Sequence, residues 1–387
     1  MSDYSLKIAL LVPALITLFW FVELWFSSGK NSKAKKHLAF FMLCGFFSMY
    51  GGYLYFTGLF EYYALGYFII KSFSFAQLPA FYLYLKSLIK PSIERKTYIK
   101  HYTIPVISGF VAVFFLLILF SREEGASMFE NYFTPEAFTI KQKWAYYFDI
   151  SFRNLFVLLG VFYLVLIHRQ VKASFKKLLN LCADADSKNP SWISIANILY
   201  IVITVFAFVL FNVTSIHFNN LKDNYLYFPY ILLGILFFLI GFKGNRQEMI
   251  EITGEEDMFP PSEALPEEVK TYLIKNLEQA IENDQVYLKH DICLPELARH
   301  IGTNRYYLSK LINSEFNMNF SDFINRYRVQ DAVEMIGVNH NEVSLSEIAS
   351  KCGFKSYISF SRNFKRQLNV SPEAYLRSQF TEKAIED

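Results

Sequence analysis

The amino-acid sequence predicts an all-α protein, in which a bundle of seven membrane-spanning helices is followed by a cytoplasmic, all-helical domain. Composition gives the first indication, because 53% of the 387 residues are apolar, 41 are Phe and only 19% are charged. This apolar excess lies almost wholly before residue 243. The second indication is that one helical pattern is written twice in the last third of the chain. The two parts are therefore expected to be separate domains.

Seven apolar segments precede residue 243, and most of them run near 20 residues. A helix of about 20 residues spans the ~30 Å hydrocarbon core of a bilayer. The first segment has an alternative interpretation as a secretory signal peptide. Its apolar run is too long for one, however, and no small-residue cleavage site follows Phe26, so we interpret it as a retained anchor. The segments are residues 6–26, 38–56, 62–85, 102–120, 146–167, 192–212 and 225–242.

The charge of the connecting loops predicts the orientation of these spans. Lys and Arg are abundant in the loops that follow the first, third and fifth segments, and sparse in the alternate loops. Because cytoplasmic loops accumulate Lys and Arg, the N-terminus is expected outside and the C-terminus in the cytoplasm. The predicted location is the inner (cytoplasmic) membrane, with the lipid bilayer as a partner.

A few polar side chains interrupt the apolar segments, and with this topology they all lie in the outer half of the membrane. Charges inside a membrane are costly and usually face a cavity, so one interpretation is a pocket that binds an unknown signal ligand. The alternative is that Asp149 and Arg153 only pair along one helix while Lys71 extends to the interface. The candidate signal pocket consists of Lys71, Asp149, Arg153, Asn154, Asn212 and His217.

The repeated pattern of the last third combines an acidic residue, an apolar residue and Ala with a Gly four positions later. Residues 296–302 correspond in this way to residues 347–353, at an offset of 51. After the Gly the offset becomes 52, so that residues 308–310 correspond to residues 360–362. Two copies are too few for a solenoid and instead indicate a pair of like supersecondary units.

Each copy predicts a short helix, a sharp turn at Gly and a second, amphipathic helix. Gly302 and Gly353 suit the turns, because a residue without Cβ takes a positive φ at little cost. The second copy opens with a capping box formed by Ser344 and Glu347, whereas Cys293 holds the cap position of the first, where a weaker cap is expected. Such a unit is a helix-turn-helix, whose second helix lies in the DNA major groove. Two units in register therefore indicate nucleic-acid binding.

Residues 266–380 resemble the DNA-binding domain of the AraC/XylS family of bacterial transcription regulators. The resemblance is strongest in the second copy, over residues 347–354, 359–365 and 370–377. It implies two helix-turn-helix units joined by a long helix, and two recognition helices that enter major-groove segments about one turn, roughly 34 Å, apart. The long helix would run from residue 321 to 336, with an inward side formed by Phe323, Ile324, Tyr327, Ala332, Val333 and Ile336.

The resemblance also implies which side chains face the bases. Arg362 is the best candidate for a bidentate contact to guanine, and Lys310 could reach the same acceptors as a point charge. Ile358 departs from the polar residue often found at its position and could contact only a thymine methyl group. Leu308, Ile312, Phe360 and Phe364 are expected in the core. The implied base-contacting residues are Tyr306, Ser309, Lys310, Tyr357, Ile358 and Arg362.

The phosphate-contacting residues are expected to be Arg305, Lys355, Lys365 and Arg366. Acidic residues outnumber basic ones by 19 to 15 from Asp257 onward, which disfavours a non-specific DNA binder. Residues 351–366, however, hold five Lys or Arg and no acid. The sequence thus predicts a local basic footprint on the second unit.

The helix predicted over residues 267–282 has its own apolar side. We expect this side to pack on the first helix-turn-helix, although pairing with a second chain in a homodimer is an alternative. The residues of this side are Val269, Tyr272, Leu273, Leu277, Ala280 and Ile281.

These observations predict a membrane-bound, one-component transcription regulator. Residues 1–242 would form the sensor domain, residues 243–266 a linker, and residues 267–387 the domain that binds double-stranded DNA; RNA polymerase is a further candidate partner. No catalytic motif occurs and the four Cys show neither metal-ligand nor disulfide spacing, so we expect no enzyme activity, cofactor or metal. The rival interpretation is a polytopic transporter or membrane enzyme whose cytoplasmic domain is a protein-interaction module.

Overall fold

The structure is a computed structural model of the chain, and it describes residues 3–29, 31–90, 92–114, 122–132, 135–185, 188–217, 227–250, 267–338 and 344–378. Within these ranges the regular secondary structure is helical apart from one isolated β-bridge, so the predicted all-α class is confirmed. The chain divides into two compact units. Unit 1 comprises residues 1–172 and 190–251, and unit 2 comprises residues 173–189 and 252–387.

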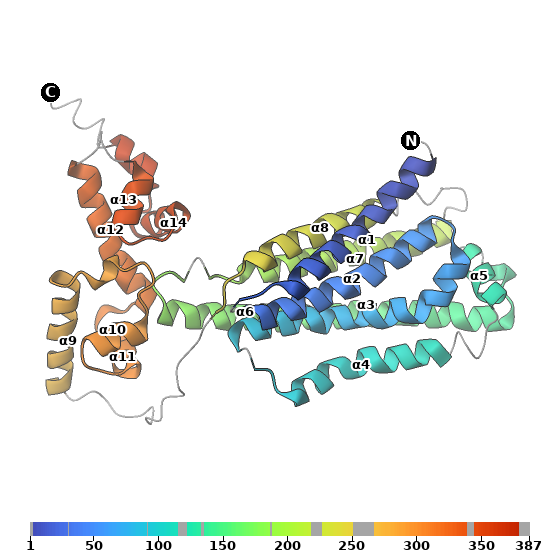
Figure 1. The fold of residues 1–387 in the computed structure, drawn as a ribbon, viewed down its shortest axis with the longest axis horizontal. Helices are drawn as coiled ribbons and strands as arrows, with labels where there is room; N and C mark the ends of the chain where they lie inside the picture. The colour runs from blue at the N-terminus through green and yellow to red at the C-terminus, as the bar shows by residue number, and fades with distance from the viewer. Residues whose placement is uncertain are drawn as a thin grey trace. The chain divides into compact units, whose positions relative to one another are not determined.

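Unit 1 is built from long helices, several of which run side by side (Figure 1). Helix α2 packs on α1 and α3, α4 and α5 pack on α3, and α8 packs on α1, α2 and α7. Helix α6 contributes to both units, because the boundary between them falls after Lys172. The helices are α1 (Asp3–Phe26), α2 (Ser32–Phe56), α3 (Phe60–Ile89), α4 (Arg95–Val113), α5 (Arg122–Glu130), η2 (Pro135–Ala137), α6 (Ile140–Leu181), α7 (Ser191–His217) and α8 (Tyr227–Arg246).

Two glycines of α8 allow this helix to approach its neighbours closely. A Cβ at Gly241 would overlap the Trp20 ring of α1, and a Cβ at Gly244 would overlap the Leu38 side chain of α2. Small residues at such positions let two helix backbones approach closely.

Five helices in the described part of the chain are long and apolar enough to cross a membrane, namely α1, α2, α6, α7 and α8. Helix α3 raises this number to six if its two parts, which meet at 56° between Tyr67 and Ile69, count as one span. The predicted fourth span, residues 102–120, is described only as far as residue 114. The number of seven spans therefore stays a prediction.

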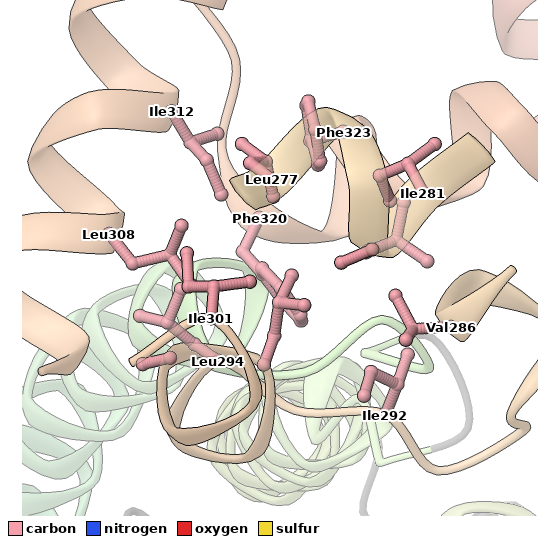
Figure 2. Packing of buried hydrophobic residues seen from close by; sticks show 14 of the residues in the cluster. Leu277, Ile281, Val286, Ile292, Leu294, Ile301, Leu308, Ile312, Phe320 and Phe323 are labelled. Carbon is pink, nitrogen blue, oxygen red and sulfur yellow. The ribbon is translucent and has the colours of Figure 1, made fainter. Parts of the chain in front are cut away.

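Unit 2 contains two hydrophobic cores, and the first forms around the first helix-turn-helix. Apolar side chains from α9, η4, α10, α11 and α12 converge in this core (Figure 2). Among them, Leu308 and Phe323 are at most 1% exposed. The helices of the unit are α9 (Glu267–Glu282), η4 (Val286–Leu288), α10 (Leu294–His300), α11 (Arg305–Phe316), α12 (Phe320–Val338), α13 (Leu345–Lys351) and α14 (Tyr357–Leu368).

Most of the apolar side predicted for α9 is confirmed. Its buried residues Leu273, Leu277, Ala280 and Ile281 all belong to the first core, which confirms that this helix packs on the first helix-turn-helix. The remainder of the prediction is wrong, because the side chains of Val269 and Tyr272 are 39% and 59% exposed. Both lie in the first two turns of α9, where they are not part of the core.

The second core lies around the second helix-turn-helix and includes the C-terminal half of α12. Phe360 and Phe364 of α14 are fully buried in it, as predicted, and Tyr375 and Leu376 pack against it. Helix α12 thus joins the two helix-turn-helix units within unit 2, as the resemblance implied. Of its predicted inward side, Phe323, Ile324, Ala332 and Ile336 are buried, and Tyr327 and Val333 are partly buried against the two cores.

A segment distant in sequence completes the first core. Residues 173–189 belong to unit 2, and Ala183 is 2% exposed within that core. Its carbonyl oxygen accepts hydrogen bonds from Ser321 Oγ at 2.9 Å and from Asn325 Nδ2 at 3.0 Å, both on α12. Its N–H donates to the Ile292 carbonyl oxygen at 3.2 Å. The sequence-based domain boundaries did not include this segment in the C-terminal domain.

Candidate functional site

The two helix-turn-helix units share their turn geometry. Gly302 follows α10 with φ +74° and Gly353 follows α13 with φ +83°, so both predicted turn positions use the left-handed region. At Gly353 a second constraint applies, because a Cβ there would lie 2.7 Å from the Leu288 carbonyl oxygen. Both glycines are therefore required by backbone conformation or by close approach.

Side-chain caps begin three of the four helices in the two helix-turn-helix units. The recognition helices start in the same way, since Asn304 accepts from the Tyr307 N–H and Ser356 accepts from the Ser359 N–H. At the first helices the units differ. Ser344 caps α13 by accepting from the Glu347 N–H, whereas Cys293 makes no side-chain cap, which confirms the weaker cap predicted there.

The recognition helices also end alike, a feature that the sequence analysis missed. Asn317 follows α11 with φ +51°, and Asn369 follows α14 with φ +59°. Asn is the residue other than Gly that most readily takes this left-handed capping conformation. The two positions are 52 residues apart, the same offset as in the rest of the recognition helices.

The candidate reading face of α11 follows one side of that helix. Tyr306, Ser309 and Lys310 are all half-buried, and Lys310 Nζ lies 5.9 Å from the centre of the Tyr306 ring. Asn313, one turn further on, donates to Ser309 Oγ at 3.4 Å and is exposed. Spacings of three, four and seven residues place these side chains on one face. Asn313 extends the predicted set by one polar group.

The candidate reading face of α14 centres on Ile358 and Arg362. Ile358 is 70% exposed, more than any other large hydrophobic side chain in the described part of unit 2. Arg362, one turn later, is also exposed. An apolar side chain held in water next to an arginine suits a surface that contacts both a thymine methyl group and guanine acceptors.

Tyr357 is placed differently from the other predicted base contacts. Its ring lies 5.9 Å from that of Phe360 and packs against the second core. Its hydroxyl donates to the Glu373 carboxylate, and burial together with this carboxylate raises the pKa of Tyr357 to about 12. Tyr357 therefore connects the start of α14 to the segment that follows this helix.

The predicted phosphate contacts divide into two groups. Lys355 and Lys365 are exposed and Arg305 is half-buried. Arg366 instead forms an ion pair with Asp322 of α12 and donates to Asn363 Oδ1 at 2.6 Å. Arg366 thus fixes α14 against α12 in this structure.

A buried polar cluster of unit 1 surrounds Asp149 of α6, whose side chain is 1% exposed. Lys71 Nζ of α3 lies 2.8 Å from its Oδ1, and Arg153 Nη2 lies 2.5 Å from its Oδ2. The Tyr132 hydroxyl donates to Oδ2 at 2.7 Å, and the Tyr67 hydroxyl donates to Oδ1. One carboxylate therefore binds two cations and two hydroxyl groups.

The structure brings together three of the six residues predicted for the signal pocket. Asp149 and Arg153 do pair along α6, but Lys71 binds the same carboxylate instead of extending to an interface. Asn154 is exposed on α6, and the side chains of Asn212 and His217 lie outside the described residues. Tyr67 and Tyr132 were missed, because no local spacing distinguishes them from the rest of the 26 Tyr.

Comparison with known proteins finds similarity in the C-terminal part of the chain. The family model described as "Helix-turn-helix domain" matches residues 297–378. Regulatory protein PocR of Salmonella typhimurium (strain LT2) is 30% identical over 108 residues, which are 28% of this chain and 35% of PocR. Transcriptional regulatory protein HptR of Staphylococcus aureus (strain NCTC 8325) is 27% identical over 101 residues, which are 26% of this chain and 39% of HptR.

A further relative is the uncharacterized HTH-type transcriptional regulator SAS0078 of Staphylococcus aureus (strain MSSA476), 26% identical over 99 residues, which are 26% of this chain and 13% of that protein. The chain thus spans at most 39% of the length of these three relatives. No solved structure matches it. The matches and the paired geometry of α10–α11 and α13–α14 together identify residues 297–378 as a helix-turn-helix domain of the AraC type, like those of transcriptional regulators.

Proposed function

We propose that this chain is a membrane-bound transcription regulator that binds double-stranded DNA sequence-specifically through its two helix-turn-helix units. The observation that carries the proposal is the pair of helix-turn-helix units, joined by α12, whose turns are alike and whose recognition helices begin and end alike. In such domains the second helix of each unit enters the major groove. Here these recognition helices are α11 and α14.

Within the proposal, Tyr306, Ser309 and Lys310 of α11 and Ile358 and Arg362 of α14 read base edges. Tyr357 contributes less than the sequence predicted, because its hydroxyl is bonded to Glu373. Arg305, Lys355 and Lys365 bind phosphates. Arg366 does so only after leaving Asp322.

Residues 1–242 form the membrane domain in this proposal, residues 243–266 the linker and residues 267–387, with residues 173–189, the DNA-binding domain. The apolar outer surface of unit 1 supports membrane insertion, since Phe19, Leu158 and Val202 are 59%, 67% and 56% exposed. Water-soluble surfaces rarely present contiguous apolar area of this kind. The apolar segments favour seven spans, and the loop charges favour an N-terminus outside and a DNA-binding domain in the cytoplasm.

The cluster around Asp149 is the proposed sensor site, because a buried intramembrane carboxylate with two cations is costly to maintain and usually functional. A ligand acts as a signal only if it binds two states of unit 1 with different affinities. Helix α6 is the proposed connection to DNA binding. It carries Asp149 and continues into the segment that completes the first core of unit 2.

The test is selection of binding sites from randomised duplex DNA by the full-length chain in lipid nanodiscs. Full length is needed because a fragment that begins after residue 189 would lack the Ala183 segment of the first core. We expect a motif with two elements about one helical turn apart. A palindromic motif would additionally indicate a homodimer. Recovery of no motif at any salt concentration would contradict the proposal and favour the interaction-module interpretation, and it would leave RNA polymerase without a role as partner.

A further inference from the structure

A cavity of about 300 Å³ lies inside unit 1 next to the Asp149 cluster. Most of its wall is apolar and aromatic, with Phe75, Phe152 and Phe237 among the lining residues, while Lys71 and Arg153 also line it. A second cavity of about 260 Å³ is lined by these same two cations. Small-molecule sites combine apolar walls with a few polar groups and measure roughly 300–1,000 Å³. The first cavity lies at the small end of this range.

The charge that faces the cavity is positive. Lys71 and Arg153 share the single carboxylate of Asp149, so these three groups together carry a net charge of +1. The Asp149 oxygens also accept from two tyrosine hydroxyls, which leaves this carboxylate saturated with donors. The Lys71 ammonium has three N–H groups, and one of them is engaged by Asp149 Oδ1. A negatively charged group is therefore the complementary occupant.

A buried amide adds a second, independent indication. Gln77 lines the cavity and is 1% exposed, and its Nε2 has no hydrogen-bond partner. Its Oε1 accepts from the Tyr200 hydroxyl at 3.0 Å. Buried polar atoms are nearly always satisfied, so an amide group without a partner beside a cavity points to a bond that a ligand completes.

The hydroxyl groups of the same wall are already engaged as donors. Thr204 donates to the Tyr200 carbonyl oxygen at 2.8 Å, and Ser74 donates to the Ile70 carbonyl oxygen at 2.7 Å. Ser48 lies 2.9 Å from Ser74 Oγ, to which it donates because the Ser74 proton is in use. The polar wall thus offers the Lys71 ammonium and the Gln77 amide, both donors, to a bound molecule.

We propose that this cavity binds an amphipathic oxyanion, namely a single-chain acid whose carboxylate or phosphate lies at Lys71, Arg153 and Gln77 and whose apolar body lies against the phenylalanines. The small volume favours one chain over the two chains of a phospholipid. The binding site stands on the geometry alone, and its role as the signal rests on the proposed function.

Octanoate is the first probe, because it is ionised at pH 7.4, well above the usual carboxyl pKa of about 4–5. Its binding to the full-length chain in phosphatidylcholine nanodiscs is measured by calorimetry, with empty nanodiscs subtracted. Octanol and octylamine serve as neutral and cationic controls. We expect saturable binding of octanoate, and at least tenfold weaker binding of both controls, since neither control offers a negative charge to Lys71 and Arg153. Equal affinity for octanol would overturn the proposal.

Variants separate recognition from stability. Lys71→Met leaves Asp149 bound to Arg153 and both tyrosines, and it should weaken octanoate binding about tenfold. Gln77→Leu removes the unpartnered amide and also the acceptor of the buried Tyr200 hydroxyl, so it should weaken octanoate binding and lower the unfolding temperature of the empty protein. The matched control is Asn197→Leu, because Asn197 is 3% exposed with an unpartnered Nδ2 but lines neither cavity. It should raise the unfolding temperature and leave octanoate affinity unchanged. Unchanged octanoate affinity in both Lys71→Met and Gln77→Leu would contradict the site.

Two further measurements identify the source of the acid and its role. Nanodiscs containing phosphatidylglycerol test whether an anionic lipid headgroup takes the same site: competition with octanoate would support the oxyanion site with a lipid as occupant, and lack of competition would support a free acid. DNA binding is then measured with and without octanoate. Octanoate binding without DNA binding would reject the proposed function and keep the site, whereas DNA binding without octanoate binding would reject the site alone.

Discussion

Arg328 of α12 connects the two halves of the DNA-binding domain although it is 1% exposed. Its Nε donates to the Tyr287 carbonyl oxygen and its Nη2 to the Lys289 carbonyl oxygen, both at 2.7 Å. The guanidinium also lies 5.6 Å from the centre of the Phe354 ring, which belongs to the second core. Burial lowers the pKa of Arg328 to about 10, so this residue stays charged at neutral pH.

Replacing Arg328 with Met should destabilise unit 2 by about 3 kcal/mol, because two buried carbonyl groups lose their donor. Lys should restore little of this loss, since one ammonium does not reproduce the planar fork of a guanidinium. Hydrogen exchange of the full-length chain measures the effect as faster exchange in α10, α12 and α13. The control is Lys275→Met on the exposed side of α9. Unaltered exchange in Arg328→Met would show that the buried bonds contribute nothing.

Arg362 and Lys365 should differ in the kind of DNA affinity that they provide. Arg362→Ala should cost about 1–3 kcal/mol at one base position and relax the sequence preference there. Lys365→Ala should weaken binding to all sequences alike and reduce the dependence of log K on log salt by about one unit. Titrations of a selected operator and of its single-base variants at several salt concentrations distinguish the two. Equal, sequence-independent losses would reject the base contact.

Local rules of residue chemistry predicted some of these positions and could not predict others. The turn positions of Gly302 and Gly353 could be predicted, because a tight turn between two helical patterns requires a positive φ. The role of Arg328 could not be predicted, because its hydrogen-bond partners lie 39 and 41 positions earlier in the chain and no sequence periodicity indicates them. Tyr67 and Tyr132 were missed for the same reason, since only the fold brings them to Asp149.

At the scale of elements, α6 is longer than a membrane requires. Its 42 residues correspond to about 63 Å, whereas a bilayer core measures about 30 Å. The apolar segment at residues 146–167 predicted the part of α6 that resembles a span. The last part of α6 mixes apolar residues with Lys and Asn, so hydropathy gave no indication that residues 173–189 belong to the first core of unit 2. Ala183, which is buried in that core, and Leu181, which packs against it, reveal this role.

Oxidation should link Cys182 to Cys293 if residues 173–189 are seated as described. The two residues form an antiparallel β-bridge, and the flanking bond from the Ala183 N–H to the Ile292 carbonyl oxygen makes them the non-hydrogen-bonded pair. Cα atoms of such a pair lie about 4.5 Å apart, within the range of a disulfide. With glutathione disulfide as oxidant, two thiols yield one disulfide and two molecules of reduced glutathione.

Peptide mapping of the oxidised full-length chain measures this cross-link. Cys44 and Cys352 are buried and serve as internal controls that should stay reduced. Either Cys182→Ser or Cys293→Ser should abolish the product. A folded protein whose Cys182 and Cys293 never link would show that the segment after α6 lies elsewhere in solution.

For the whole molecule, the orientation of the chain decides whether the DNA-binding domain can reach DNA. Hydropathy predicted an apolar segment within each long helix that the structure describes in unit 1, because a run of about 20 apolar residues forms either a membrane span or a buried core helix. Its prediction for α4, residues 102–120, overlaps that helix but is only partly among the described residues. An odd number of spans puts the two ends of the chain on opposite sides, and charge bias then selects the cytoplasmic one.

Labelling of single cysteines tests this orientation, in a background where Cys44, Cys182, Cys293 and Cys352 are replaced by Ala. Leu59→Cys, between α2 and α3, should react in intact cells with a membrane-impermeant maleimide, because that loop is predicted outside. Glu94→Cys, just before α4, should react only after permeabilisation, since it lies in a loop rich in Lys and Arg. Both positions precede helices whose caps use no side-chain hydrogen bond, so neither change removes one. The reverse labelling pattern would put the DNA-binding domain on the wrong side of the membrane and reject regulation of transcription by the tethered chain.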